Sequence, residues 1–147
     1  MKRLLSILML VAFFSSVFPM HEAAAATTKQ GKIVSEVKKT IGVKYKMGGT
    51  TTKGFDCSGL TQYVYKKSVK TKLPRTSQQQ GKVKAKKVNL KQVQPGDLLF
   101  YGSENAAYHV GVYIGQGKMV HAPKPGDRVK VTQTKYYKPS FAKRVVQ

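Results

Sequence analysis

The chain has 147 residues, of which 27 are Lys or Arg and only 6 are Asp or Glu, so its formal net charge is +21. Its length suits one compact domain with a single core and leaves no room for a second. The charge indicates an anionic partner, such as nucleic acid, a membrane surface or a cell-wall polymer, with a lysine-rich surface that serves only solubility as the alternative, and it says nothing about the fold.

The N-terminal segment is typical of a secretory signal peptide. A short basic start precedes an apolar run over residues 4–18 and a cluster of alanines that ends at Ala26. The apolar run is too short for an ordinary membrane span, although an uncleaved anchor is the alternative. We therefore expect a signal peptide over residues 1–26, a single domain over residues 27–147, and secretion to the cell wall. Secretion, together with lysines that are scattered and not interleaved with aromatic side chains, argues against a nucleic-acid partner.

Helical periodicity dominates the first part of the expected domain. Residues 27–32 are polar and are expected to precede the first helix, which is predicted over residues 33–41. After a loop rich in Gly and Thr, a second helix is predicted from Asp56 or Cys57 to about Lys67, with Asp56 as its N-cap. A short third helix is predicted over residues 77–80, where Thr76 precedes it as the cap.

After Gly81 the pattern changes to the alternation expected of strands. A turn at Pro95–Asp97 opens the first of them. The predicted strands cover residues 98–101, 110–114, 118–122, 128–132 and 143–146. Helices followed by a run of antiparallel strands predict an α+β domain.

Cys57 is the only cysteine of the chain, so a secreted protein offers it no intramolecular disulfide partner. It is therefore an intermolecular crosslink, a buried inert thiol or a nucleophile. At the start of a helix, free backbone N–H groups and the helix dipole favour negative charge, so we expect the pKa of Cys57 to be lowered. The flanking Gly54, Asp56, Ser58 and Gly59 fit a tight, accessible turn better than a core, which favours the nucleophile.

A cysteine nucleophile needs a base and a group that orients the base. His109 and His121 are the two histidines outside the expected signal peptide. If a three-residue loop at 115–117 closes a hairpin, His121 lies opposite Gly111, and the two histidines are diagonal neighbours about 7–8 Å apart at the backbone. A two-residue loop would put them on opposite faces of the sheet. We predict His109 as the base and His121 as the residue that orients it; hydrogen-bonded filler in a sheet is the alternative.

Six short segments resemble the NlpC family of papain-like cell-wall peptidases and follow the family's order along the expected domain. They are Gly42–Thr50, Gly54–Leu60, Leu73–Gln80, Gln94–Phe100, His109–Gly115 and Met119–Ala122. The resemblance implies a papain-like α+β fold, in which N-terminal helices, including the Cys57 helix, pack on a small antiparallel β-sheet. By position, Cys57, His109 and His121 match the family's Cys–His–polar triad.

The resemblance also implies roles for residues around this triad. Tyr45 matches a tyrosine that helps to form the oxyanion site with the Cys57 backbone N–H. Asp56 and Ser58 match residues that bind the free amine of an N-terminal L-alanine in some members. Met47 stands where many members have a tryptophan before the glycine pair.

The resemblance implies that the chain hydrolyses peptidoglycan stem peptides, commonly at the bond between D-γ-glutamate and diaminopimelate or lysine, through a Cys57 thioester. An amidase or a γ-glutamyl polymer hydrolase with the same triad is one alternative, and a non-enzymatic cationic wall-binding protein is another. The expected partners are stem peptides and, through the basic surface, anionic wall polymers. We expect a monomer without a cofactor and without a metal, because two histidines and one cysteine far apart are a poor zinc site.

Overall fold

The computed structural model describes residues 28–147, so the predicted signal peptide lies outside the described residues. The helices are α2 (Lys29–Lys39), α3 (Cys57–Val69), α4 (Ser77–Gly81) and the 3₁₀ helix η1 (Leu90–Gln92). The strands are β1 (Thr50–Thr51), β2 (Gly54–Phe55), β3 (Lys86–Val88), β4 (Leu98–Tyr101), β5 (His109–Gly115), β6 (Lys118–His121), β7 (Lys130–Gln133) and β8 (Phe141–Arg144). No helix within residues 28–147 combines the length and the apolarity needed to cross a bilayer.

The helices start where polar caps satisfy their first backbone N–H groups. Asp56 caps α3 and Thr76 caps α4, as predicted. For α2 the prediction that residues 27–32 precede the helix is wrong from Lys29 onward. The Thr28 side chain accepts a hydrogen bond from Gly31 N–H at 3.0 Å, so this cap starts the helix four residues before the first apolar position of the pattern.

The strands form a small hairpin and one larger antiparallel sheet. In the six-stranded sheet the order is β3-β8-β4-β5-β6-β7, and every neighbouring pair is antiparallel. This arrangement confirms the predicted α+β class. Strand β7 begins two residues later than predicted, and β8 begins two residues earlier. The sequence did not predict the short strands β1, β2 and β3.

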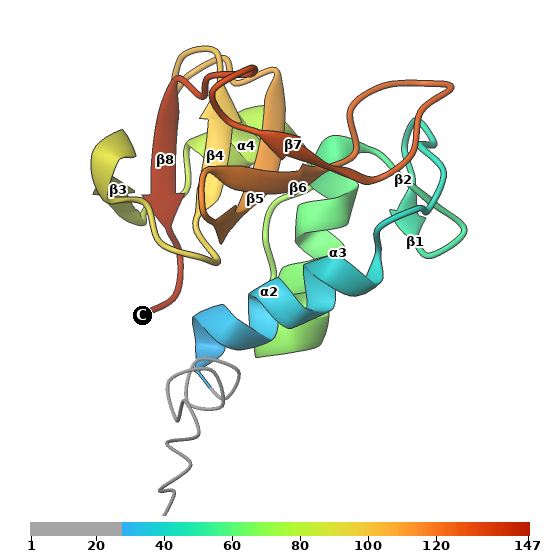
Figure 1. The fold of residues 1–147 in the computed structure, drawn as a ribbon, viewed down its shortest axis with the longest axis horizontal. Helices are drawn as coiled ribbons and strands as arrows, with labels where there is room; N and C mark the ends of the chain where they lie inside the picture. The colour runs from blue at the N-terminus through green and yellow to red at the C-terminus, as the bar shows by residue number, and fades with distance from the viewer. Residues whose placement is uncertain (1–27) are drawn as a thin grey trace, which may run out of the picture.

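The two faces of the larger sheet are covered differently. Figure 1 shows α2 and α3 side by side on one side of the sheet, and their apolar residues pack against its helix-facing side chains. This main core includes Ile33, Leu60, Phe100, Val110 and Val120. The outer face carries a second cluster with Leu99, Tyr101, Met119 and the partly buried Tyr113 and Tyr137. Both predicted catalytic histidines belong to strands of this sheet, on its outer face.

The β5–β6 hairpin has the predicted register but not the predicted loop. Val112 pairs with Val120 and Tyr113 with Met119, the register that sets His121 opposite Gly111. The loop itself has two residues, because Gly115 pairs with Lys118 around Gln116 and Gly117, which both have positive φ. The prediction that a two-residue loop would separate the histidines is therefore wrong, since a bulge between Tyr113 and Gly115 restores the register.

Candidate active site

Cys57 is the first residue of α3 and is held in a tight turn. The Asp56 carboxylate accepts hydrogen bonds from Gly59 N–H at 2.7 Å and from Gly48 N–H at 3.0 Å, so one side chain ties the helix start to the preceding loop. A Cβ at position 59 would lie 1.9 Å from the Gly49 carbonyl oxygen. The glycine two residues after the cysteine is therefore required by close backbone approach, and it lets the loop and the helix start pack directly against each other.

A charged cluster surrounds the residue before the cysteine. Arg75 donates to both carboxylate oxygens of Asp56, at 3.0 and 2.6 Å, and its Nη1 also lies 3.1 Å from Ser58 Oγ. Partial burial pushes the pKa of Asp56 upward, but the hydrogen bonds from Arg75 and from the Gly59 and Gly48 backbone outweigh it, and the pKa lies below its ordinary value. The predicted substrate-binding residues Asp56 and Ser58 are thus joined by an arginine.

The Cys57 thiol does not have the lowered pKa that the sequence predicts. Burial raises the pKa of Cys57, and the neighbouring Asp56 carboxylate raises it further. Hydrogen bonds from Val110 and Ser58 act in the opposite direction and do not compensate. The prediction is therefore wrong in sign, because the helix N-terminus that favours a thiolate is desolvated and lies beside an anion.

The two histidines form a hydrogen-bonded chain with a third side chain. His109 Nε2 lies 2.8 Å from His121 Nδ1, and His121 Nε2 lies 2.8 Å from Thr132 Oγ1 on β7. The chain leaves Nδ1 of His109 as the ring nitrogen available to a reacting group. This geometry is the one that the sequence predicts for a base and the residue that orients it, with Thr132 added at the far end.

Burial keeps both imidazoles neutral. The pKa of His109 is lowered to about 4, first by burial and then by the neighbouring His121. The pKa of His121 is also lowered to about 4, mainly by burial, with Lys130 contributing. Tyr101 and Tyr137 enclose the pair, because their rings stack at 3.9 Å and both lie within 6 Å of the His109 ring. A neutral imidazole can accept a proton, which a general base must do.

The cysteine and the histidines meet at the start of β5. Val110 N–H is one of the hydrogen-bond donors to Cys57, and Val110 directly follows His109. The α3 N-terminus thus reaches the start of β5, the strand that carries the predicted base. Burial and then Tyr108 raise the pKa of Tyr137, and the Cys57 thiol adds to this rise; the Tyr137 ring lies 5.8 Å from that of His109. Three separate elements, α3, β5 and the β7–β8 connection, therefore converge on one point.

The predicted oxyanion residue Tyr45 lies on the same side of the molecule as the cysteine. It forms a β-bridge with Phe55, two residues before Cys57. Burial raises the pKa of Tyr45, and Cys57 and Asp56 raise it further, so its hydroxyl stays protonated near the thiol. A protonated phenol beside a nucleophile can donate a hydrogen bond to a developing oxyanion.

Three residues of this region are absent from the predicted site, although Arg75 was considered as a residue that lines the cleft or starts a helix. Thr132 and Tyr137 lie beyond the hairpin, and their approach to the histidines depends on how β7 and the following loop return to the sheet. Arg75 is 19 residues from Asp56, and its place beside the cap depends on the path of the chain between α3 and α4. Only Arg75 had a local signal, since it precedes the Thr76 cap within one of the family-like segments.

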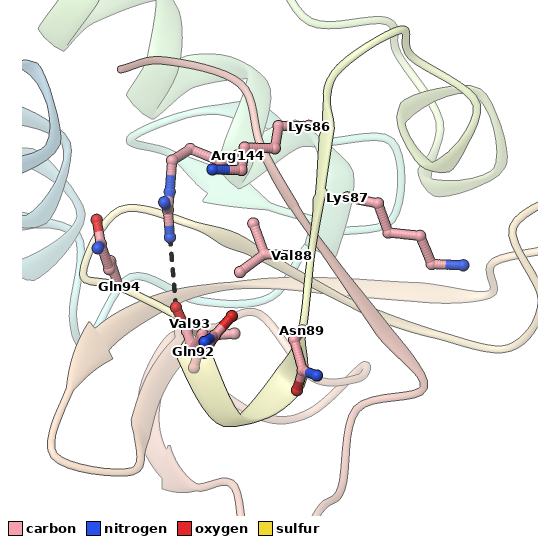
Figure 2. A pocket seen from close by; sticks show the side chains of 8 residues that line it. All are labelled: Lys86, Lys87, Val88, Asn89, Gln92, Val93, Gln94 and Arg144. Carbon is pink, nitrogen blue, oxygen red and sulfur yellow. Dashed lines mark hydrogen bonds between the residues drawn. The ribbon is translucent and has the colours of Figure 1, made fainter.

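A cationic recess of about 430 Å³ lies at the opposite edge of the sheet, where β3 pairs with β8. Its lining residues are Lys86, Lys87, Val88, Asn89, Gln92, Val93, Gln94 and Arg144, three of them cationic and none acidic. Figure 2 shows the Arg144 guanidinium turned toward the Gln92 carbonyl. The same guanidinium pairs with the fully buried Asp97 at 2.8 Å, which fixes it in place. The predicted site residues do not line this recess.

Comparison with known proteins points to one family. The sequence profile of the NlpC/P60 family matches residues 42–147. Protein P54 of Enterococcus faecium is 42% identical over 110 residues, which are 75% of this chain and 21% of that protein. Gamma-DL-glutamyl hydrolase of Bacillus subtilis is 37% identical over 145 residues, which are 95% of this chain and 34% of that protein. The chain thus spans about a fifth to a third of the length of these curated relatives.

Solved structures agree with the sequence comparison. The NlpC/p60 domain of the peptidoglycan hydrolase SagA superposes with a TM-score of 0.76 at 39% identity, covering 79% of this chain and 98% of that one. The peptidoglycan hydrolase RipB of Mycobacterium tuberculosis superposes with a TM-score of 0.73 at 26% identity, covering 88% of this chain and 73% of that one.

Proposed function

Because the chain belongs to the NlpC/P60 family, we propose that it is a cysteine endopeptidase that hydrolyses the stem peptides of peptidoglycan. The hydrogen-bonded chain from His109 through His121 to Thr132, which starts beside the Cys57 helix, is the observation that carries this proposal. Its neutral imidazoles suit a base that takes a proton from a thiol and later from water.

The proposed reaction starts from an uncharged thiol and imidazole. The Cys57 sulfur attacks the scissile carbonyl carbon while its proton passes to His109 Nδ1. The negative oxygen of the tetrahedral intermediate accepts hydrogen bonds from the Cys57 backbone N–H and the Tyr45 hydroxyl. The C–N bond breaks, the leaving amine takes the proton from His109, and a thioester remains. Water then gives a proton to His109 and its oxygen to the carbonyl, and the thiol is released with that proton.

The proposed scissile bond joins D-γ-glutamate to diaminopimelate or lysine, as the family-like segments imply. A second candidate is a polymer of γ-linked glutamate. It is favoured by the 37% identical gamma-DL-glutamyl hydrolase, whose match covers 95% of this chain, and by the charge of +21, which suits a polyanionic substrate. Both candidates share the γ-glutamyl carbonyl and differ in the residue that supplies the leaving amine.

Mass spectrometry of digestion products separates the candidates. Purified peptidoglycan and a γ-glutamate polymer are each incubated with the wild-type protein and with the Cys57→Ala variant. New diaminopimelate or lysine N-termini from the wall would support the first candidate, whereas shorter glutamate oligomers alone would support the second. Equal digestion by wild type and Cys57→Ala would contradict the thioester mechanism. Wall binding without any digestion would favour the non-enzymatic alternative.

We further propose secretion to the cell wall and retention on anionic wall polymers through the basic surface. The cationic recess supports this idea through its lysines, because Lys86 forms no ion pair within residues 28–147 and Lys87 pairs with the half-exposed Glu104, whereas the charge of Arg144 is balanced by the buried Asp97. Lys86→Glu with Lys87→Glu should lower wall binding at low salt more than Lys29→Glu with Lys32→Glu, a matched pair on α2. Equal binding by both double variants, or wild-type binding that survives molar salt, would contradict retention through the recess.

A further inference from the structure

His121 is hydrogen-bonded through both of its ring nitrogens. Nδ1 lies 2.8 Å from His109 Nε2, and Nε2 lies 2.8 Å from Thr132 Oγ1. A neutral imidazole carries one proton, so one nitrogen donates and the other accepts. The direction of either hydrogen bond therefore determines the direction of the other.

Only one direction suits the proposed function, on which this inference rests. His109 can take a proton from Cys57 only if its Nδ1 carries a lone pair, which requires the His109 proton to sit on Nε2. That proton is then donated to His121 Nδ1, so the His121 proton must sit on Nε2. There it needs an acceptor, and Thr132 Oγ1 lies at hydrogen-bond distance. We propose that Thr132 is a positioning residue that keeps the catalytic tautomer of both histidines by accepting the proton of His121 Nε2–H.

The position of Thr132 in the sheet supports this role. Thr132 pairs with Met119 across β6 and β7, so its side chain is the diagonal neighbour of His121 on the outer face. A β-branched side chain on a strand has few χ1 choices, which fixes the oxygen relative to the ring. The hydroxyl is therefore held at its place by the same strand pairing that holds His121.

Without this hydroxyl, the buried His121 Nε2–H would lose its acceptor. Leaving a buried donor unpaired is costly, so the His121 proton would move toward Nδ1. There it would donate to His109 Nε2 and push the His109 proton to Nδ1, where it blocks the base. Removal of one hydroxyl, two residues away along a hydrogen-bonded chain, thus changes the tautomer of the reacting histidine.

Other titratable groups around His121 do not replace Thr132. Lys130, which pairs with His121 across the strands, forms an ion pair with Asp127 at 2.8 Å. The Tyr137 ring centroid lies 6.2 Å from that of His121. The His109 ring meets the His121 ring edge-on. Of these groups, His109 is the one that is hydrogen-bonded to the His121 ring, and it occupies the other nitrogen.

The test compares Thr132→Val, which keeps the shape and loses the hydroxyl, with Thr132→Ser, which keeps the hydroxyl. Thr134→Val is the matched control, because the Thr134 hydroxyl donates to the Gly117 carbonyl instead of meeting a histidine. Peptidoglycan fragments serve as substrate for kcat and KM. The protein is also labelled with ¹⁵N-histidine, so that ring-nitrogen chemical shifts report the tautomers of its three histidines without any substrate.

We expect Thr132→Val to lower kcat about tenfold with KM within about twofold, the effect of losing one hydrogen bond in the transition state. Thr132→Ser and Thr134→Val should stay within about threefold of wild type. In the ¹⁵N spectra, wild type and Thr132→Ser should carry the His121 proton on Nε2, and Thr132→Val should shift it toward Nδ1.

Three outcomes would overturn the proposal. The first is a His121 proton on Nδ1 in the wild type, and the second is an unchanged tautomer in Thr132→Val. The third is a loss of kcat in Thr132→Ser as large as that in Thr132→Val, which would assign the effect to packing and not to the hydroxyl. Because the spectra need no substrate, a protein without wall activity would contradict the proposed function and still leave the tautomer result decisive.

Discussion

The two halves of the candidate site are built from different interactions. On the helix side, Cys57 follows a carboxylate that is held by an arginine and two backbone N–H groups. On the sheet side, His109 and His121 are neutral, buried and joined to Thr132 through ring nitrogens. One half is organised by charge and the other by the direction of proton donation.

Exposure separates the two halves further. The Arg75 side chain is 36% exposed, whereas His121 is 3% exposed. Salt can therefore screen the ion pair beside Cys57, and it has little access to the histidine chain. As a result, perturbations of pH, salt and sequence should affect the two halves separately.

The largest expected effect is on the sheet side. His109→Ala should lower the rate of stem-peptide hydrolysis about 10³-fold, because it removes the base and the end of the histidine chain. The rate is measured as peptide release from purified walls, with circular dichroism as the check on folding. A folded variant that retains a tenth of the activity would remove His109 from the proposed mechanism.

The next largest effect concerns the charge state of the thiol. Because burial and Asp56 raise the pKa of Cys57, the rate of alkylation by iodoacetamide should keep rising, about 100-fold between pH 7 and pH 9. The rate is followed by mass spectrometry of the single cysteine. A plateau below pH 8 would instead indicate a thiolate–imidazolium pair, and the two halves would then share a charge.

Acid should destabilise the sheet side first. With folded pKa values of about 4 against 6.5, the histidines bind protons more readily in the unfolded chain. Stability is therefore present above pH 6.5 and is lost as the pH falls toward 4, by about 3 kcal/mol for each histidine. Urea unfolding as a function of pH measures this loss, and His109→Gln should about halve it between pH 6.5 and pH 4, because the contribution of His121 remains.

The pKa of Asp56 is shifted in the same direction as those of the histidines, but the lower ordinary pKa of a carboxyl places its contribution in a lower pH window. Its folded pKa is below the ordinary value, so its contribution is present above that value and is lost only at more acidic pH. A slope between pH 6.5 and pH 4 that persists undiminished in His109→Gln and disappears in Asp56→Asn would reverse the assignment of the two windows.

The smallest expected effect is on the helix side. Asp56→Ala should destabilise the fold by about 1–2 kcal/mol in urea unfolding, since it removes the N-cap of α3. Asp56→Asn should lose less, because an asparagine oxygen can still cap the helix. Equal losses in the two variants would mean that the ion pair with Arg75, and not the cap, carries the stability.

Local patterns were enough to predict much of the fold and the core of the site. The start of α3 followed from Asp56, and the register that aligns His109 with His121 was predicted from a three-residue turn, although the structure reaches it through a two-residue turn and a bulge. Both features depend on residues close in sequence. The α+β class required only the change from helical to strand periodicity after Gly81.

Interactions between segments that are distant in sequence could not be predicted from such local patterns. Thr132 reaches His121 through a strand that returns after a loop of eight residues, and a loop of that length does not determine a register. The raised pKa of Cys57 depends on burial, which a position at the start of a helix does not reveal. Long-range packing thus decided the chemistry of groups whose identity the sequence already indicated.

The bulge at the end of β5 has a consequence for how this hairpin can change during evolution. Removing the single extra residue between Tyr113 and Gly115 would turn one histidine to the opposite face of the sheet, although it would leave the turn intact. Deletions or insertions of two residues would preserve the facing. Related sequences that keep both histidines should therefore differ in hairpin length by an even number of residues. Where they differ by one residue, that residue should form a bulge in the longer hairpin.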